Sequence, residues 1–89
     1  MKELPDTQWL VYFVDGKIDT IWIYYHKPEE GGRSYGKMYG YYREDRSFVE
    51  NTSKNLKLMD WDTFVGCVSP DMDNTKIFDS KEDIFLEMI

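Results

Sequence analysis

The sequence predicts an α+β domain in which an antiparallel sheet of three or four strands, connected as a meander, packs against helices. Three observations support this class: an apolar β-hairpin at residues 9–25, a strand-like run with four tyrosines at residues 34–43, and two helical patterns after residue 60. A chain of 89 residues has room for one core, so residues 1–89 are expected to form a single domain.

The hairpin is the clearest element. Asp15-Gly16 separates two apolar runs and favours the type I′ turn whose twist suits a hairpin. Regular pairing outward from this turn places Trp9 opposite Trp22. One predicted face then carries Trp9, Val11, Phe13, Ile18, Trp22 and Tyr24, and the other carries Leu10, Tyr12, Val14, Ile21, Ile23 and Tyr25. Neither face is polar, so both need a cover.

A third strand is predicted over residues 34–43. Its large side chains alternate with small or flexible ones, and the glycines leave gaps that a ring from the adjacent strand can fill. The two predicted sides are Tyr35, Lys37, Tyr39 and Tyr41, and Gly36, Met38, Gly40 and Tyr42. Residues 44–46 form a polar turn before a short fourth strand at 47–50, and residues 56–59 fit either a strand or a helix start.

Two helices are expected after residue 60. Asp60 is a suitable N-cap for a helix over 61–68, in which apolar residues recur at the helical period. Ser69-Pro70 ends that helix, because the residue before proline avoids the helical region. After an extended piece at 75–78, Ser80 caps a helix over 80–89. Its apolar stripe is Ile84, Phe85, Met88 and Ile89. Both helices are predicted to pack on one face of the sheet, which leaves the other face to a partner.

The chain is acidic, with a net charge of −6 that lies mostly in its second half. Residues 1–46 carry seven basic and eight acidic side chains, whereas residues 47–89 carry four and nine. This balance argues against binding to duplex nucleic acid or to an anionic membrane, both of which attract basic surfaces. It suits a soluble protein whose partner has a basic surface.

Catalytic, cofactor and targeting signals are weak throughout. Cys67 is the only cysteine, which excludes an intrachain disulfide, and its place in the helical pattern predicts a buried, inert thiol. His26 is the only histidine and has no serine or cysteine partner at a recognised spacing. The sequence contains no signal peptide or membrane-spanning run. We therefore expect a cytoplasmic protein that is not an enzyme and needs no cofactor.

A partial calcium-loop pattern runs from Asp71 to Glu82. Lys76 occupies the position that requires glycine, and Pro70 stands where an entering helix should continue. An acidic turn that leads into a strand and a helix cap is the better interpretation, so no metal site is predicted.

The sequence thus predicts a non-catalytic protein-binding domain, a small acidic inhibitor or adaptor. One form is a phage-type antagonist of a host enzyme whose carboxylates imitate nucleic acid phosphates. The alternatives are binding of single-stranded nucleic acid or a small ligand through the tyrosine-rich strand, and a homodimeric accessory protein. The Trp9 and Trp22 face is expected to form the core, and the side with Tyr12, Tyr25 and the tyrosine strand is expected to bind the partner. The candidate binding residues are Tyr12, Tyr25, Tyr35, Tyr39, Tyr41, Asp60, Asp62, Asp71, Asp73 and Asp79.

Overall fold

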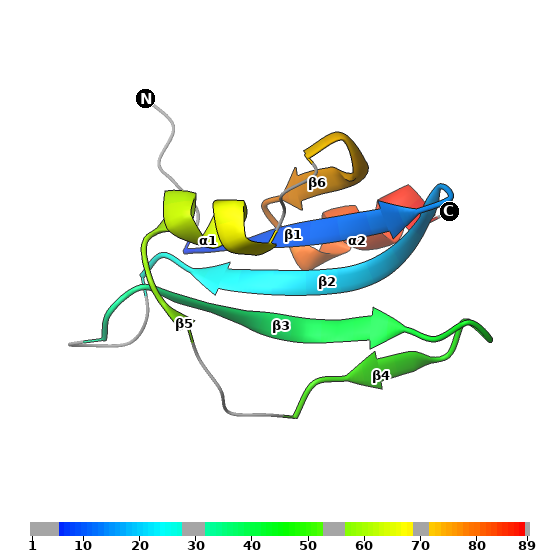
Figure 1. Ribbon diagram of the computed structural model, residues 1–89, viewed down its shortest axis with the longest axis horizontal. Coiled ribbons are helices and arrows are strands. Elements are labelled where there is room, and N and C mark those ends of the chain that lie inside the picture. Colours follow the sequence, from blue (N-terminus) through cyan, green and yellow to red (C-terminus); the bar gives the residue numbers. More distant parts are fainter. Residues whose placement is uncertain (1–5, 28–31, 53–56, 69–71, 89) are drawn as a thin grey trace.

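The structure, a computed structural model, describes residues 6–27, 32–52, 57–68 and 72–88 (Figure 1). Its strands are β1 (Thr7–Val14), β2 (Lys17–Tyr25), β3 (Tyr35–Tyr42), β4 (Phe48–Glu50), β5 (Lys57–Leu58) and β6 (Thr75–Phe78). Its helices are α1 (Trp61–Val68), the 3-10 turn η1 (Met72–Asn74) and α2 (Lys81–Met88).

One antiparallel sheet has the order β4-β3-β2-β1-β6, and β5 also pairs with β3. The α+β class, the antiparallel pairing and the meander from β1 to β4 are confirmed. The predicted count of three or four strands is wrong, because β5 and β6 join the same sheet. Strand β6 forms from the extended piece expected at 75–78, and it pairs with the outer edge of β1.

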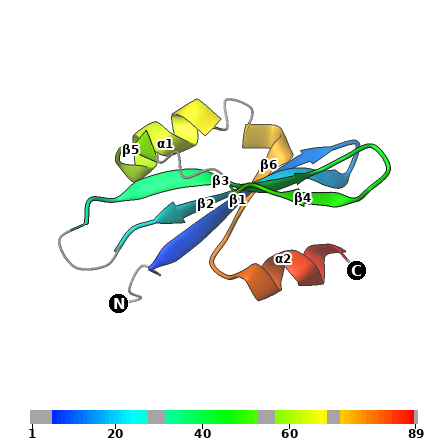
Figure 2. The same cartoon turned by 90° about the horizontal axis from the view of Figure 1, so that it is seen from below.

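The two helices lie on opposite sides of the sheet (Figure 2). Phe64 of α1 packs with Leu10 and Tyr24, whereas Ile84 of α2 packs with Trp9 and Val11. The prediction that both helices cover one face is therefore wrong. Because β6 runs between them as an edge strand of the sheet, the chain passes from one side to the other at that edge. We call the two sides the α1 face and the α2 face.

A β-bulge at Asp19 changes the predicted register. Asp15 and Gly16 have φ angles of 53° and 77°, which confirms the expected turn. Phe13 pairs with Ile18, but Tyr12, which precedes Phe13 in β1, pairs with Thr20. The extra residue moves every later side chain of β2 to the opposite face from the one predicted.

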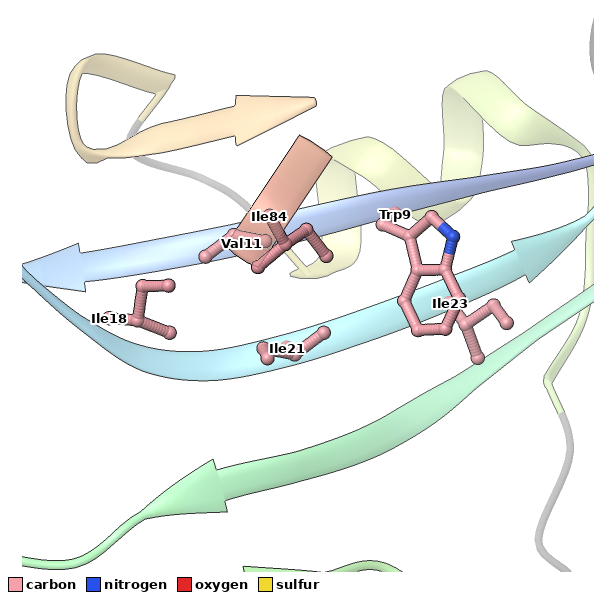
Figure 3. Packing of buried hydrophobic residues seen from close by; sticks show 6 residues of the cluster. All are labelled: Trp9, Val11, Ile18, Ile21, Ile23 and Ile84. Carbon is pink, nitrogen blue, oxygen red and sulfur yellow. The ribbon is translucent and has the colours of Figure 1, made fainter. Parts of the chain in front are cut away.

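Each face consequently has its own core. The α2 face buries Trp9 together with Ile21 and Ile23, while Trp22 joins Leu10 on the α1 face. The predicted pairing of Trp9 with Trp22 in one core is thus wrong, since Trp9 pairs with Ile23. Figure 3 shows the larger cluster, which consists of Trp9, Val11, Ile18, Ile21, Ile23 and Ile84.

Both predicted helix caps are present. The Asp60 carboxylate accepts the Thr63 backbone N–H at 2.8 Å, and the Ser80 hydroxyl accepts the Asp83 backbone N–H at 3.3 Å. The buried state expected for Cys67 is wrong: its side chain is exposed, because the apolar stripe of α1 that packs on the sheet consists of Trp61, Phe64, Val65 and Val68.

The apolar stripe expected on α2 is only partly buried. Ile84 is 3% exposed, but Phe85 is 53% exposed. The side chains of Met88 and Ile89 lie outside the described residues. Helix α2 therefore covers only part of its face.

Candidate functional site

The five predicted tyrosines divide between the two faces. Tyr25 and Tyr35 stack on the α2 face with ring centroids 4.8 Å apart, and Tyr39 meets the edge of Trp9 there at 5.0 Å. Tyr12 and Tyr41 lie on the α1 face, where both pair with Thr20. The structure therefore contradicts the expectation that Tyr12, Tyr25 and the tyrosine strand share one binding side.

Tyr12 and Tyr41 belong to the part of the α1 face that α1 leaves uncovered. Helix α1 packs over Leu10 and Tyr24, and the uncovered part lies nearer the β1–β2 turn (Figure 2). Tyr12 and Tyr41 are 37% and 39% exposed. We call this surface the open face; it consists of Tyr12, Val14, Thr20 and Tyr41, and Ile77, which pairs with Leu10, lies at its border.

The sheet fixes the positions of these side chains. Thr20 pairs with Tyr12 on one side and with Tyr41 on the other, so the two tyrosines flank it on neighbouring strands. On the other side of β1, Tyr12 pairs with Thr75 of β6, a residue that is only 9% exposed. Adjacent strands are about 4.8 Å apart, which puts the two tyrosine positions about 10 Å from each other.

The predicted carboxylates do not form a cluster in the described part of the chain. Asp60 caps α1, Asp62 lies in its first turn, and Asp73 and Asp79 flank the two ends of β6. Asp71 lies outside the described residues. Among the residues that are described, no group of three or more His, Cys, Asp or Glu side chains is placed to hold a metal ion. Asp73 is in η1, which contacts β1, and η1 leads directly into Thr75 beside Tyr12.

Sequence reasoning missed a second arrangement, which surrounds His26. Its Nε2 lies 2.8 Å from Gln8 Oε1, and Gln8 Nε2 donates to the Asp79 carboxylate at 3.0 Å. Because an amide oxygen only accepts, we assign the proton of the neutral imidazole to Nε2. The ring lies 4.8 Å from that of Tyr24 and 5.0 Å from that of Trp61. No motif signals this arrangement, since it depends on how β1, β2 and β6 meet.

A shallow pocket of about 360 Å³ opens beside His26. Two hydroxyl groups of its lining are already engaged: the Tyr24 hydroxyl donates to the Met59 carbonyl at 2.7 Å, and the Ser34 hydroxyl donates to the His26 carbonyl at 3.0 Å. Burial raises the pKa of the Tyr24 hydroxyl, so the phenol stays protonated. These contacts hold α1 and the start of β3 against the end of β2, and we assign them a structural role.

We expect the free energy of unfolding to decrease as the pH is lowered, because His26 becomes protonated. Burial, and to a lesser extent the nearby Lys27 charge, lower the pKa of the folded imidazole below 6.5. The unfolded chain then binds the proton first, so stability is lost as the pH falls through 6.5 and levels off below the folded pKa. Urea unfolding followed between about pH 7.5 and about pH 5.5 measures this slope, where histidine is the side chain that normally titrates. The His26→Gln variant should lack most of the slope, and an unchanged slope would refute the assignment.

No protein-family model, no curated protein and no solved structure matches this chain. Within the ranges that the structure describes, no helix has the length and apolar content needed to cross a membrane. Function is therefore inferred from the geometry and charge of the surfaces themselves.

Proposed function

We propose that this chain is a non-catalytic protein-binding domain that docks its partner on the open face. The observation that supports this most is the position of Tyr12 and Tyr41, two half-exposed rings on the same face of the sheet. Tyrosine is enriched at protein interfaces because its ring contributes apolar area and its hydroxyl a hydrogen bond.

The sheet holds these anchors in place before binding. Tyr12 lies on β1 and Tyr41 on β3, and both strands pair with neighbours on each side. Ordering such residues on binding costs little conformational entropy compared with ordering a loop. Val14 and Ile77 extend the apolar area and are 43% and 41% exposed. Apolar residues gathered on one surface are typical of a binding site, in contrast to scattered single ones.

The charge of the chain indicates a basic partner. The net charge is −6, and η1, which contains Asp73, contacts β1. Acidic groups at the rim of an interface steer a basic protein toward it and contribute more to the association rate than to the final affinity. We therefore expect binding to weaken as salt is raised.

The test compares variants in affinity capture from the native cell, followed by mass spectrometry and by titration of the captured protein. Tyr12→Ser combined with Tyr41→Ser should weaken binding by at least about 100-fold, as expected when two interface anchors are removed. Leu86→Ser is the matched control, because Leu86 is 68% exposed on α2 at the opposite face. Circular dichroism should show that the variants are folded. A partner that binds the tyrosine double variant as tightly as the wild type would refute the proposal.

An inhibitor that imitates nucleic acid, such as a phage-type antagonist of a host enzyme, is a narrower form of this proposal. It requires a row of carboxylates at phosphate-like spacing. Asp60 is engaged as a helix cap, and Asp79 accepts a hydrogen bond from Gln8. Asp73 and Asp79 are separated by the length of β6. The aromatic open face therefore has more support as the docking surface than the carboxylates.

The two remaining alternatives make different predictions. Single-stranded nucleic acid would stack on neighbouring rings of one surface, and Tyr25, Tyr35 and Tyr39 place such rings on the α2 face rather than on the open face. A second copy of the chain on the open face would give a dimer whose population rises with concentration. Light scattering after size-exclusion chromatography distinguishes that dimer from a monomer that binds another protein.

A further inference from the structure

A groove of about 240 Å³ lies on the α2 face, between α2 and the strands β3 and β4. It is on the opposite side of the sheet from the open face. Its floor includes Trp9 and Ile21, which Figure 3 shows beside Ile84. Its full lining is Trp9, Ile21, Tyr39, Tyr42, Phe48, Lys81, Ile84 and Phe85. The groove exists because α2 buries Ile84 but leaves Phe85 half exposed at the rim.

The walls of the groove are predominantly aromatic and meet at steep angles. Trp9 and Tyr39 lie edge to face at 5.0 Å, and Tyr42 and Phe48 are tilted by 60° at the same distance. Such walls offer both ring faces and ring edges, which suits a further aromatic ring in an edge-to-face arrangement. The volume is slightly below the usual range for drug-sized ligands, about 300–1,000 Å³, and so indicates a small molecule.

Lys81 supplies the cationic donor of the lining. Its ammonium group donates to the Tyr39 hydroxyl at 2.7 Å and lies 5.1 Å from the centre of the same ring. That hydrogen bond is the main cause that raises the pKa of Lys81, with smaller contributions from Glu50 and Glu82. An ammonium group has three donor hydrogens, so a ligand can accept one while the bond to Tyr39 persists.

We propose that this groove binds a small uncharged aromatic molecule that carries one hydrogen-bond acceptor, with its ring between the aromatic walls and its acceptor at the Lys81 ammonium group. The neighbouring charges favour an uncharged ligand. Glu50 and Glu82 both raise the pKa of the Lys81 ammonium group through their charges, so a carboxylate bound at Lys81 would be repelled by them. A ketone, ester or amide oxygen accepts the same hydrogen bond without that repulsion.

The test is a nuclear magnetic resonance titration of the whole chain with two probes of the same ring size, uncharged 2-acetylnaphthalene and anionic 2-naphthoate. We expect saturable shifts for the Trp9 indole N–H and for the backbone amides of Lys81 and Phe85, and tighter binding of the ketone. The Trp61 indole should be unaffected, because Trp61 packs on the α1 face. Absence of saturable shifts, shifts centred on Trp61, or tighter binding of the naphthoate would each overturn the proposal.

Matched lysine variants test the role of the donor. Lys81→Met keeps an apolar side chain of similar length and should weaken binding of the ketone by about tenfold, as expected for the loss of one hydrogen bond to a charged group. Lys76→Met is the control, because Lys76 lies 5.3 Å over the ring of Phe13, outside the groove. Equal effects of the two variants would exclude Lys81 as the donor. Since the open face lies on the other side of the sheet, failure here leaves the protein-binding proposal unaffected.

Discussion

Replacement of Gly36 by alanine is expected to destabilise the domain by about 3 kcal/mol or more, at the upper end of the cost of overpacking a core. Gly36 lies on β3 and faces α1, and a Cβ atom built there would overlap ring atoms of Phe64. Phe64 is fully buried against Leu10 and Tyr24, so its ring has no space to move aside. Relief requires α1 to shift away from the sheet.

Urea unfolding of Gly36→Ala measures this loss, and Gly66→Ala is its matched control. Gly66 lies within α1, and a Cβ atom there meets nothing within 4 Å. The same substitution should therefore stabilise the protein by up to about 1 kcal/mol through helix propensity. In addition, Phe64→Leu should offset part of the Gly36→Ala loss, so that the double variant is more stable than additivity predicts. Equal effects at the two glycines would contradict the close packing of α1 on β3.

The features that the sequence predicts correctly are local ones. The Asp15-Gly16 turn and the caps at Asp60 and Ser80 depend on residues only a few positions apart, and all three are present. The gap at Gly40 is also filled as expected by a ring from the adjacent strand, that of Phe48. The gap at Gly36 is filled from α1 instead, which no local pattern shows.

The sequence does not predict which side chains share a face of the sheet, because this depends on two β-bulges. The first, at Asp19, exchanges the faces of β2. The second lies between β2 and β3, where Ile21 pairs with Gly40 but Trp22 pairs with Met38, so that Tyr39 is the extra residue. A bulge adds one residue without changing the hydrophobic pattern on either side of it, and strict alternation then assigns the wrong face.

These bulges determine which tyrosines lie on the same face of the sheet. Tyr39 joins the α2-face groove, while Tyr41 stays on the α1 face opposite Thr20. Strict alternation instead placed Tyr39 and Tyr41 on the same side. The chain therefore has two smaller aromatic surfaces on opposite faces, and we propose a different kind of ligand for each.

Replacement of Ile84 by alanine is the second change with a large expected effect, a loss of about 3 kcal/mol for truncation of a buried isoleucine. Among the α2 side chains that the structure describes, Ile84 is the buried one, and it packs with Trp9, Val11 and Ile21. Truncation leaves a cavity under α2 and removes the contact that anchors this helix to the sheet.

Leu86→Ala is the control for this prediction, because Leu86 is on the same helix and 68% exposed. It should change the unfolding free energy by less than about 0.5 kcal/mol, as is usual for surface substitutions. Amide hydrogen exchange then shows which elements lose stability in the Ile84→Ala variant. Protection should decrease first in α2, since that helix depends on the anchor, and less in β1 and β2, which pair along most of their length. Unchanged protection of α2 would mean that other contacts hold the helix, and that the groove beneath it does not depend on Ile84.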